Sequence, residues 1–183
     1  MTKILVHLAN GFEEMEALIP VDVWRRAGFH VETVSITGTL EITGAHQIKV
    51  IADQLFENTN YSEADMIFLP GGMPGAKNLD MHEGLRKQLL SFSKEGKVLG
   101  AICAAPLVLG HNQLLKGKNA TCFPGFEKEL YGANHTGAPV VTDGQIVTGK
   151  GAGVAMDFAL EVVACFKDQI YALELAKKMQ VPI

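Results

Sequence analysis

Short apolar runs alternate along the chain with longer stretches in which apolar positions recur at helical spacing. The runs are rich in Val, Ile and Leu, which is typical of strands buried on both faces of a parallel sheet. The longer stretches place apolar side chains three and four residues apart, which predicts amphipathic helices. Strands are expected at residues 4–9, 30–36, 66–69 and 98–102, and helices at residues 13–27, 79–92, 104–109, 154–166 and 168–179.

Two segments depart from this alternation. Residues 38–53 are rich in turn-forming residues and short alternating runs, which favours a small antiparallel excursion from the sheet. Residues 140–148 flank an Asp-Gly turn and predict a hairpin. Pro20 is expected to kink the first helix. The whole pattern predicts an α/β, flavodoxin-like fold, with a mostly parallel sheet sandwiched by helices in a single domain over residues 1–183.

Composition narrows the functional classes. The 183 residues are 48% hydrophobic and 20% charged, with a net charge of −4, and no apolar run reaches the roughly 18 residues of a membrane span. The scattered lysines form no basic stripe, so neither nucleic acid nor membrane is expected as a partner. The first residues lack the features of a signal peptide, which predicts a cytoplasmic protein.

The three cysteines form neither an even disulfide framework nor a C-x-x-C pair, so neither a structural disulfide nor a metal site is expected. Cys103 directly follows an apolar run and precedes small residues and Pro106, which predicts a strand-to-helix elbow. A helix N-terminus favours an anion and lowers a thiol pKa, so Cys103 is a candidate thiolate nucleophile. The alternative is that Cys103 is a small buried apolar residue. Cys122 and Cys165 are interpreted as packing residues.

Three loops, at residues 10–16, 70–75 and 103–106, are expected to meet beyond the carboxyl ends of the strands, where such sheets bind ligands. The backbone N–H groups of Gly72 and Ala104 could then form an oxyanion hole for a reacting carbonyl. The alternative for the glycine pair at 71 and 72 is a flexible turn.

Glu13, Glu14 and Glu16 crowd the first turn of the first helix, where carboxylates complement the helix dipole. Two of them are expected to do only that. One carboxyl group is expected to reach Cys103, where burial would raise its pKa, keep it protonated and suit it to proton transfer. No histidine is obviously local to Cys103, so a Cys-His-Asp triad cannot be placed.

Four motifs follow one another at loop positions along the chain. They are Gly11-Phe12-Glu13-Glu14-Met15-Glu16-Ala17, Leu69-Pro70-Gly71-Gly72, Ala101-Ile102-Cys103-Ala104-Ala105-Pro106 and Gly151-Ala152-Gly153. With these motifs the chain resembles the ThiJ/PfpI family, nearest to its branch of parkinsonism-associated protein deglycases and bacterial oxidative-stress chaperones. The resemblance implies a class I glutamine amidotransferase-like sandwich and a homodimer. It also implies a reactive Cys103 hydrogen-bonded to a protonated Glu16, with the amides of Gly72 and Ala104 alongside.

The family resemblance implies a cofactor-free enzyme that acts on a small dicarbonyl such as methylglyoxal or on a glycated protein. Its alternative is a redox-responsive chaperone or oxidative-stress sensor that uses Cys103. A cysteine peptidase is disfavoured because Ala104 stands where the peptidase branch has a histidine. Phe123 replaces a histidine of some aldehyde-converting members, which puts efficient glyoxalase turnover in question. His46 matches a basic residue near the partner's pocket in some relatives, and Arg26 is expected to retain a neighbouring role.

Overall fold

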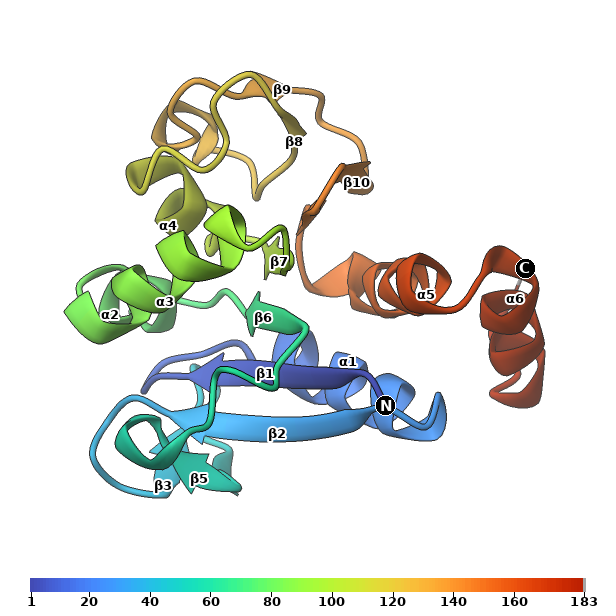
Figure 1. Cartoon of the computed structure of the whole chain (residues 1–183), viewed down its shortest axis with the longest axis horizontal. Helices are drawn as coiled ribbons and strands as arrows, with labels where there is room; N and C mark the ends of the chain where they lie inside the picture. Colours follow the sequence, from blue (N-terminus) through green and yellow to red (C-terminus); the bar gives the residue numbers. More distant parts are fainter. Residues whose placement is uncertain (183) are drawn as a thin grey trace.

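A seven-stranded sheet forms the centre of the molecule in a computed structural model that describes residues 1–182 (Figure 1). The strand order is β10-β11-β7-β6-β1-β2-β5, and only β10 runs antiparallel to its neighbour. The strands are β1 (Lys3–Leu8), β2 (His30–Ser35), β5 (Gln54–Leu55), β6 (Met66–Leu69), β7 (Val98–Ile102), β10 (Val140–Asp143) and β11 (Ile146–Gly149).

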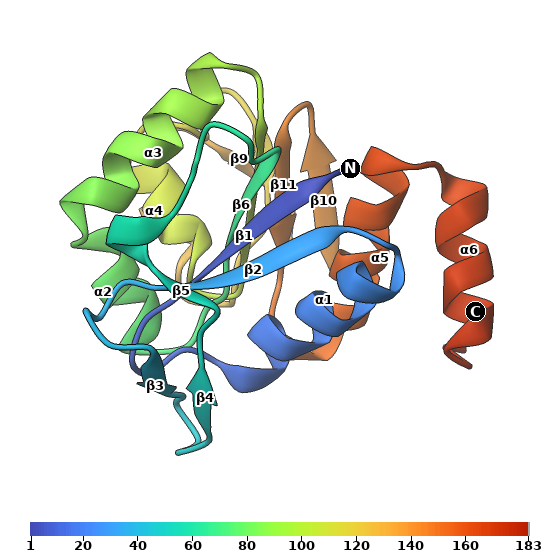
Figure 2. The ribbon, with the colours of Figure 1, turned by 60° about the horizontal axis from the view of Figure 1, so that its bottom comes forward.

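Helices cover both faces of this sheet (Figure 2). α1 (Glu14–Arg26) and α5 (Ala155–Phe166) pack together on one face, and α6 (Gln169–Lys178) packs against α5 at the edge of the molecule. The opposite face carries α2 (Gly75–Asp80), α3 (Glu83–Lys94) and α4 (Pro106–His111). Three single-turn helices, η1 (Phe56–Asn58), η2 (Glu127–Glu129) and η3 (Ala152–Val154), lie in the connections.

Alternation along the strands divides the core into two layers, because successive strand side chains point to opposite faces. Ile4 and Val6 of β1 join one apolar cluster, while Leu5 joins the other. The first layer is centred on aromatic side chains, where the ring of Trp24 lies edge-on to the ring of Phe68. The indole N–H of Trp24 donates a hydrogen bond to a backbone carbonyl of α5. These two layers fix the carboxyl ends of β1, β6 and β7 next to one another.

Two small sheets lie outside the main one. β3 (Glu41–Thr43) and β4 (Lys49–Ile51) form an antiparallel hairpin that reaches back toward the start of α1 (Figure 2). β8 (Asn119–Ala120) and β9 (Asn134–His135) pair in parallel.

Most of the expected elements are confirmed, including the flavodoxin-like sheet, the excursion at residues 38–53 and the hairpin at residues 140–148. The single helix expected at residues 79–92 is wrong, because α2 ends at Asp80 and α3 begins at Glu83. Between them the His82 ring accepts a hydrogen bond from the Leu85 N–H (2.9 Å) and caps α3. Pro20 lies inside a continuous α1 rather than interrupting it.

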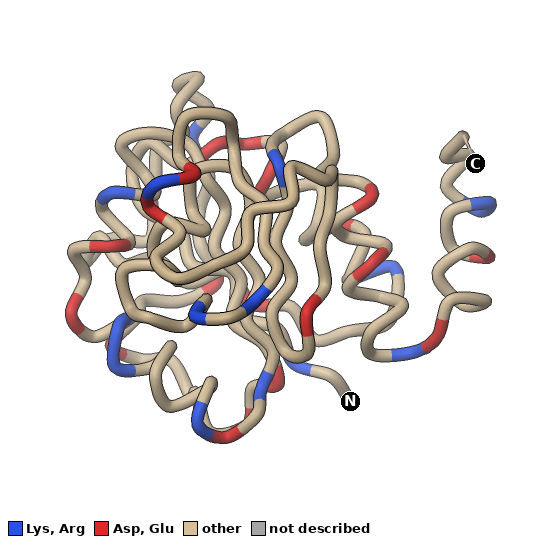
Figure 3. Tube along the Cα trace, turned by 90° about the horizontal axis from the view of Figure 1, so that it is seen from above, with Lys and Arg blue, Asp and Glu red and all other residues tan. Residues whose placement is uncertain are grey.

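The structure shows no segregation of charge along the chain and no membrane-spanning helix within residues 1–182. Basic and acidic residues are interspersed along the trace in Figure 3. Within residues 1–182, no helix combines the length and the apolar character that a membrane crossing requires.

Candidate active site

Cys103 occupies the sharp turn between β7 and α4. Its φ angle is +64°, a left-handed conformation that is uncommon for a residue with a side chain. Two main-chain hydrogen bonds hold it there. The Cys103 N–H donates to the Gly149 carbonyl (2.8 Å), and its carbonyl accepts from the Phe123 N–H (2.8 Å). Such strain persists where the surroundings enforce it, and it clusters at functional sites.

Glu16, in the first turn of α1, faces Cys103 across Gly71. One carboxyl oxygen, Oε2, accepts the Gly71 N–H (2.9 Å), and the other, Oε1, is buried and has no hydrogen-bond partner of standard geometry among residues 1–182. A Cβ atom at Gly71 would lie 2.6 Å from Glu16 Oε2 and 2.7 Å from Cys103 Cβ. The two side chains therefore meet at the one point where the backbone carries no side chain.

Burial dominates the acid–base behaviour of this pair. It raises the pKa of Glu16 to about 7, and the nearby charge of Glu13 acts in the same direction. A carboxyl group with this pKa retains its proton in a large fraction of molecules at neutral pH. Protonation also gives Oε1 a hydrogen to donate, which suits a buried oxygen without a partner.

The lowered thiol pKa expected from the helix N-terminus is wrong. Burial, followed by the charge of Glu16, raises the pKa of Cys103 to about 12, although the N–H groups of Gly72 and Ala104 oppose this shift. The short α4 begins only at Pro106, so its dipole acts on the sulfur weakly compared with burial. Because Glu16 accounts for part of the shift, a proton on Glu16 removes that part, and the two groups titrate as a pair.

Gly72 and Ala104 present backbone N–H groups to the sulfur, as the sequence predicted. Among the hydrogen bonds of residues 1–182, neither N–H donates to a protein oxygen, and both lower the pKa of Cys103. Gly72 has a φ angle of +83°, and a Cβ there would lie 2.4 Å from the Glu13 nitrogen, so only glycine fits. These two donors can stabilise negative charge on sulfur or on an oxygen bound next to it.

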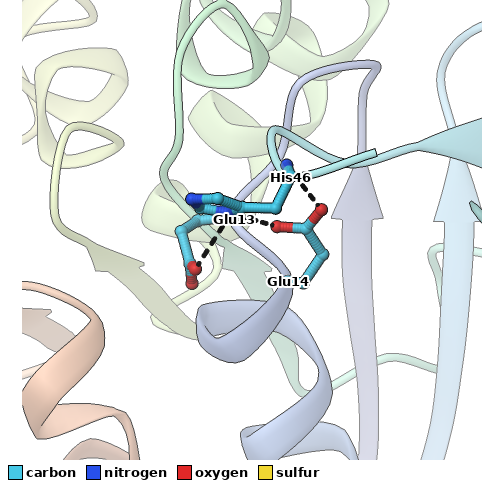
Figure 4. Close-up of side chains that lie close together, drawn as sticks. All are labelled: Glu13, Glu14 and His46. Carbon is cyan, nitrogen blue, oxygen red and sulfur yellow. Dashed lines mark hydrogen bonds and ion pairs between the residues drawn. The ribbon is translucent and has the colours of Figure 1, made fainter. Parts of the chain in front are cut away.

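The other two glutamates have structural roles, and only one of these was expected. Glu13 caps α1, since its Oε2 accepts the Glu16 N–H (2.8 Å). Glu14 is buried and binds the turn between β3 and β4. Its Oε1 accepts the His46 N–H (2.8 Å), and its Oε2 lies 2.8 Å from His46 Nδ1 (Figure 4). The expectation that a second glutamate serves only the helix dipole is therefore wrong for Glu14.

Glu13, Glu14 and His46 come together closely enough to be considered as metal ligands, since one ligand atom from each lies within 4.8 Å of the others (Figure 4). Both oxygens of Glu14 and the Nδ1 atom of His46 are already engaged with one another or with backbone N–H groups. Burial acts to raise the pKa of Glu14, but these hydrogen bonds outweigh it and lower the pKa. The arrangement fits a structural ion pair that holds the hairpin on α1.

Arg26 and the other two cysteines are the remaining candidates. Arg26, at the opposite end of α1 from Glu16, pairs with Asp22 (2.7 Å). Cys122 is buried in the second core layer, as expected for a packing residue, whereas Cys165 is exposed, so its packing interpretation is wrong. No histidine of the described residues contributes to the pKa shift of Cys103.

The sequence does not indicate which residues hold the backbone of Cys103. Gly149 and Phe123 enter the site through main-chain hydrogen bonds to Cys103. No local motif indicates either contact, because both come from segments that pair with the elbow only in the folded chain.

The chain is similar in sequence to known proteins over nearly its whole length. The model of the DJ-1/PfpI family matches residues 2–165. Protein DJ-1 homolog B of Arabidopsis thaliana is 38% identical over 96% of this chain and 40% of its own length. The Parkinson disease protein 7 homolog of Danio rerio is 31% identical over 99% of this chain and 96% of its own. YraA of Bacillus subtilis, whose name describes a cysteine protease, is 34% identical over 81% of this chain and 88% of its own.

The chain spans less than half of the length of DJ-1 homologs A and B of Arabidopsis thaliana. Solved structures of similar proteins match this chain over its full length. A DJ-1 superfamily protein of Salmonella typhimurium has a TM-score of 0.95 at 33% identity, with both chains fully covered. Oxidized DJ-1 of Toxoplasma gondii has a TM-score of 0.95 at 31% identity, also over the full length of both chains.

Proposed function

Because this chain belongs to the DJ-1/PfpI family, we propose that it is a cysteine-dependent, cofactor-free enzyme that converts reactive dicarbonyls such as methylglyoxal, or early glycation adducts, to hydroxy acids. One observation carries the proposal: Cys103 meets the buried carboxyl group of Glu16, whose Oε1 has no hydrogen-bond partner in the described part of the chain. A nucleophile, a proton carrier and two backbone donors thus share one site.

The first step is addition of sulfur to the aldehyde carbon. The thiol proton passes to Glu16, the sulfur forms a bond to carbon, and the carbonyl π electrons move to oxygen. The raised pKa of Cys103 keeps the thiol protonated at neutral pH, so this proton transfer to Glu16 is what forms the thiolate. The N–H groups of Gly72 and Ala104 stabilise the negative oxygen of the resulting hemithioacetal, which takes the proton from Glu16.

The second step moves hydrogen between the two adjacent carbons. Glu16, as a carboxylate, removes the proton from the former aldehyde carbon and returns it to the neighbouring carbon of the resulting enediolate, while the hydroxyl proton moves from the first oxygen to the second. The product is a thioester on Cys103 with a hydroxyl group beside it. Water hydrolyses the thioester and restores the thiol. Overall, a 2-oxoaldehyde and one water give one 2-hydroxy acid, so the redox change is internal and needs no external oxidant.

Turnover of methylglyoxal to lactate, measured enzymatically, tests this proposal. We expect Cys103→Ala to abolish turnover and Cys165→Ser, which alters an exposed thiol elsewhere, to retain it. Lactate formation by the Cys103→Ala variant at the wild-type rate would disprove the proposed role.

A redox-responsive chaperone is the second candidate, supported by the same two N–H groups facing the sulfur. Oxidation of Cys103 by peroxide to a sulfinate would place negative oxygens where these donors and a protonated Glu16 could bind them. The similar Toxoplasma gondii protein has been solved in an oxidized form. Protection of an aggregating client without any aldehyde, only after peroxide treatment and only with Cys103 present, would favour this role.

Peptide hydrolysis is not proposed, despite the name of the Bacillus subtilis relative. The residue after the nucleophile is Ala104, which offers no general base, and no histidine affects the thiol. Glu16 is therefore the only proton acceptor that the described structure places against Cys103.

We propose a second copy of the chain as the partner. Met15 and Leu18 project from α1 with 50% and 39% of their surfaces exposed, and Ile48, near the hairpin turn that Glu14 binds, is also exposed. Large apolar side chains gathered beside a site favour a contact surface. Sedimentation velocity should give a dimer for the wild type and a monomer for Met15→Glu; a monomeric wild type would contradict the proposal.

A further inference from the structure

An open hollow lies between two segments that hydrogen-bond to, or directly follow a residue that hydrogen-bonds to, the main chain of Cys103, and the proposed mechanism does not use it. Phe123 and Pro124 line one side, and residues 150–154 line the other. Its volume is about 430 Å³, which falls within the range of about 300–1,000 Å³ common for small-molecule sites.

Both walls of the hollow are attached to the main chain of the nucleophile. The Phe123 N–H donates to the Cys103 carbonyl (2.8 Å), and the Cys103 N–H donates to Gly149, the residue before the second wall begins (2.8 Å). Val154 and Cys103 also pack against the same apolar cluster. The hollow is therefore fixed in position relative to the main chain of Cys103.

The lining of the hollow is predominantly apolar. Phe123 is 47% exposed, although an aromatic residue of this size gains most stability when its side chain is covered. The absence of a side chain at Gly151 keeps the hollow open, since a Cβ there would lie 3.3 Å from the Phe123 ring. The one charged residue, Lys150, directs its ammonium group to the Gly137 carbonyl (3.3 Å).

We propose that this hollow binds the apolar substituent of the carbonyl substrate, so that aryl and bulky aliphatic 2-oxoaldehydes are preferred over methylglyoxal. The inference rests on the proposed function, because a substrate bound to the sulfur must direct its substituent to one side of the elbow. A methyl group would leave the Phe123 ring exposed, whereas a phenyl group would cover it and gain contact area.

The first test compares kcat/KM for phenylglyoxal and methylglyoxal. We expect the phenyl-to-methyl ratio to fall about tenfold in Phe123→Ser, which is the scale by which apolar pockets discriminate. Phe123→Leu should give an intermediate ratio. Tyr131→Ser, which removes a similarly exposed aromatic ring outside the hollow, should leave the ratio unchanged. An unchanged ratio in Phe123→Ser would overturn the inference while leaving Cys103-dependent turnover intact.

A second test separates the hollow from catalysis. Phenacyl bromide and bromoacetone both alkylate thiols, and their reaction with Cys103 requires no turnover. The rate of alkylation at Cys103 is measured by intact-protein mass spectrometry for each reagent and divided by the rate of the same reagent with glutathione. We expect the phenacyl preference of the wild type to drop about tenfold in Phe123→Ser even if no oxoaldehyde is converted. Equal preference in both proteins would overturn the inference. A changed oligomeric state with unchanged preference would also overturn it, by assigning the hollow to a contact between copies.

Discussion

Glu16 and Cys103 meet across a glycine: one Cβ placed on Gly71 would lie within 2.7 Å of both the Glu16 carboxyl oxygen and the Cys103 Cβ. This arrangement couples the two groups electrostatically. Burial raises the pKa of both, and the charge of an ionised Glu16 adds to the shift at Cys103. The state that suits the proposed chemistry has the proton on the carboxyl group and the negative charge on the sulfur, next to two backbone donors.

Replacing Glu16 with Gln should separate thiol ionisation from catalysis. Gln cannot ionise, so the like charge that raises the pKa of Cys103 disappears, and we expect alkylation by iodoacetamide to reach its half-maximal rate at a lower pH than in the wild type. Turnover of 2-oxoaldehydes should nevertheless fall by about 10²–10⁴, the usual contribution of an acid–base group. Unchanged profiles for both alkylation and turnover would contradict the coupling.

Much of this site could be predicted from local sequence. The apolar run before Cys103 and the glycines after β6 indicated the strand-to-helix elbow and both backbone N–H donors, because such elbows depend on short-range steric rules. The thiol pKa could not be predicted, since it depends on how deeply the fold buries the sulfur and on a carboxylate 87 positions away in sequence. Glu14 was also misread, because its partner, His46, lies on a hairpin whose docking is a tertiary event.

Adding one methyl group at Gly71 should disturb the site more than it disturbs the fold elsewhere. In Gly71→Ala the new Cβ meets Glu16 Oε2 at 2.6 Å, so the carboxyl group must move and lose the Gly71 N–H bond. We expect a loss of about 1–3 kcal/mol in unfolding free energy, from overpacking, together with loss of turnover.

Gly28→Ala provides the control for Gly71→Ala. This glycine ends α1 with a φ angle of +79° and has open space around it, so alanine should cost about 1 kcal/mol through backbone strain alone. Urea unfolding and turnover, measured on both variants, should show stability loss in each but loss of activity only at Gly71. Full activity in Gly71→Ala would show that the carboxyl position is not critical.

The left-handed backbone of Cys103 predicts an unusual order of stability. Glycine normally costs stability relative to alanine, but at a φ angle of +64° the alanine side chain is strained and glycine is not. We expect Cys103→Gly to be more stable than Cys103→Ala by about 0.5–1 kcal/mol in chemical denaturation. The same pair at Cys122, a buried position outside the left-handed region, should show the normal order, with alanine more stable. An alanine variant more stable than the glycine variant at Cys103 would contradict a strained elbow.

His7 should make the fold sensitive to acid. Burial, with a smaller contribution from the nearby His82, lowers the pKa of His7 from 6.5 to about 3, and its Nε2 atom lies 2.8 Å from the Tyr61 hydroxyl. The unfolded chain therefore binds a proton between these pH values while the folded chain does not, so stability is fully present above pH 6.5 and falls as the pH drops toward 3. The loss corresponds to at most about 5 kcal/mol. The free energy of unfolding is measured with urea from pH 7 to 4. We expect it to decline less steeply in the double variant His7→Leu/Tyr61→Phe, which removes both polar partners, than in the wild type. A variant of the exposed His135 should decline as the wild type does. Parallel declines in all three proteins would contradict a buried neutral His7.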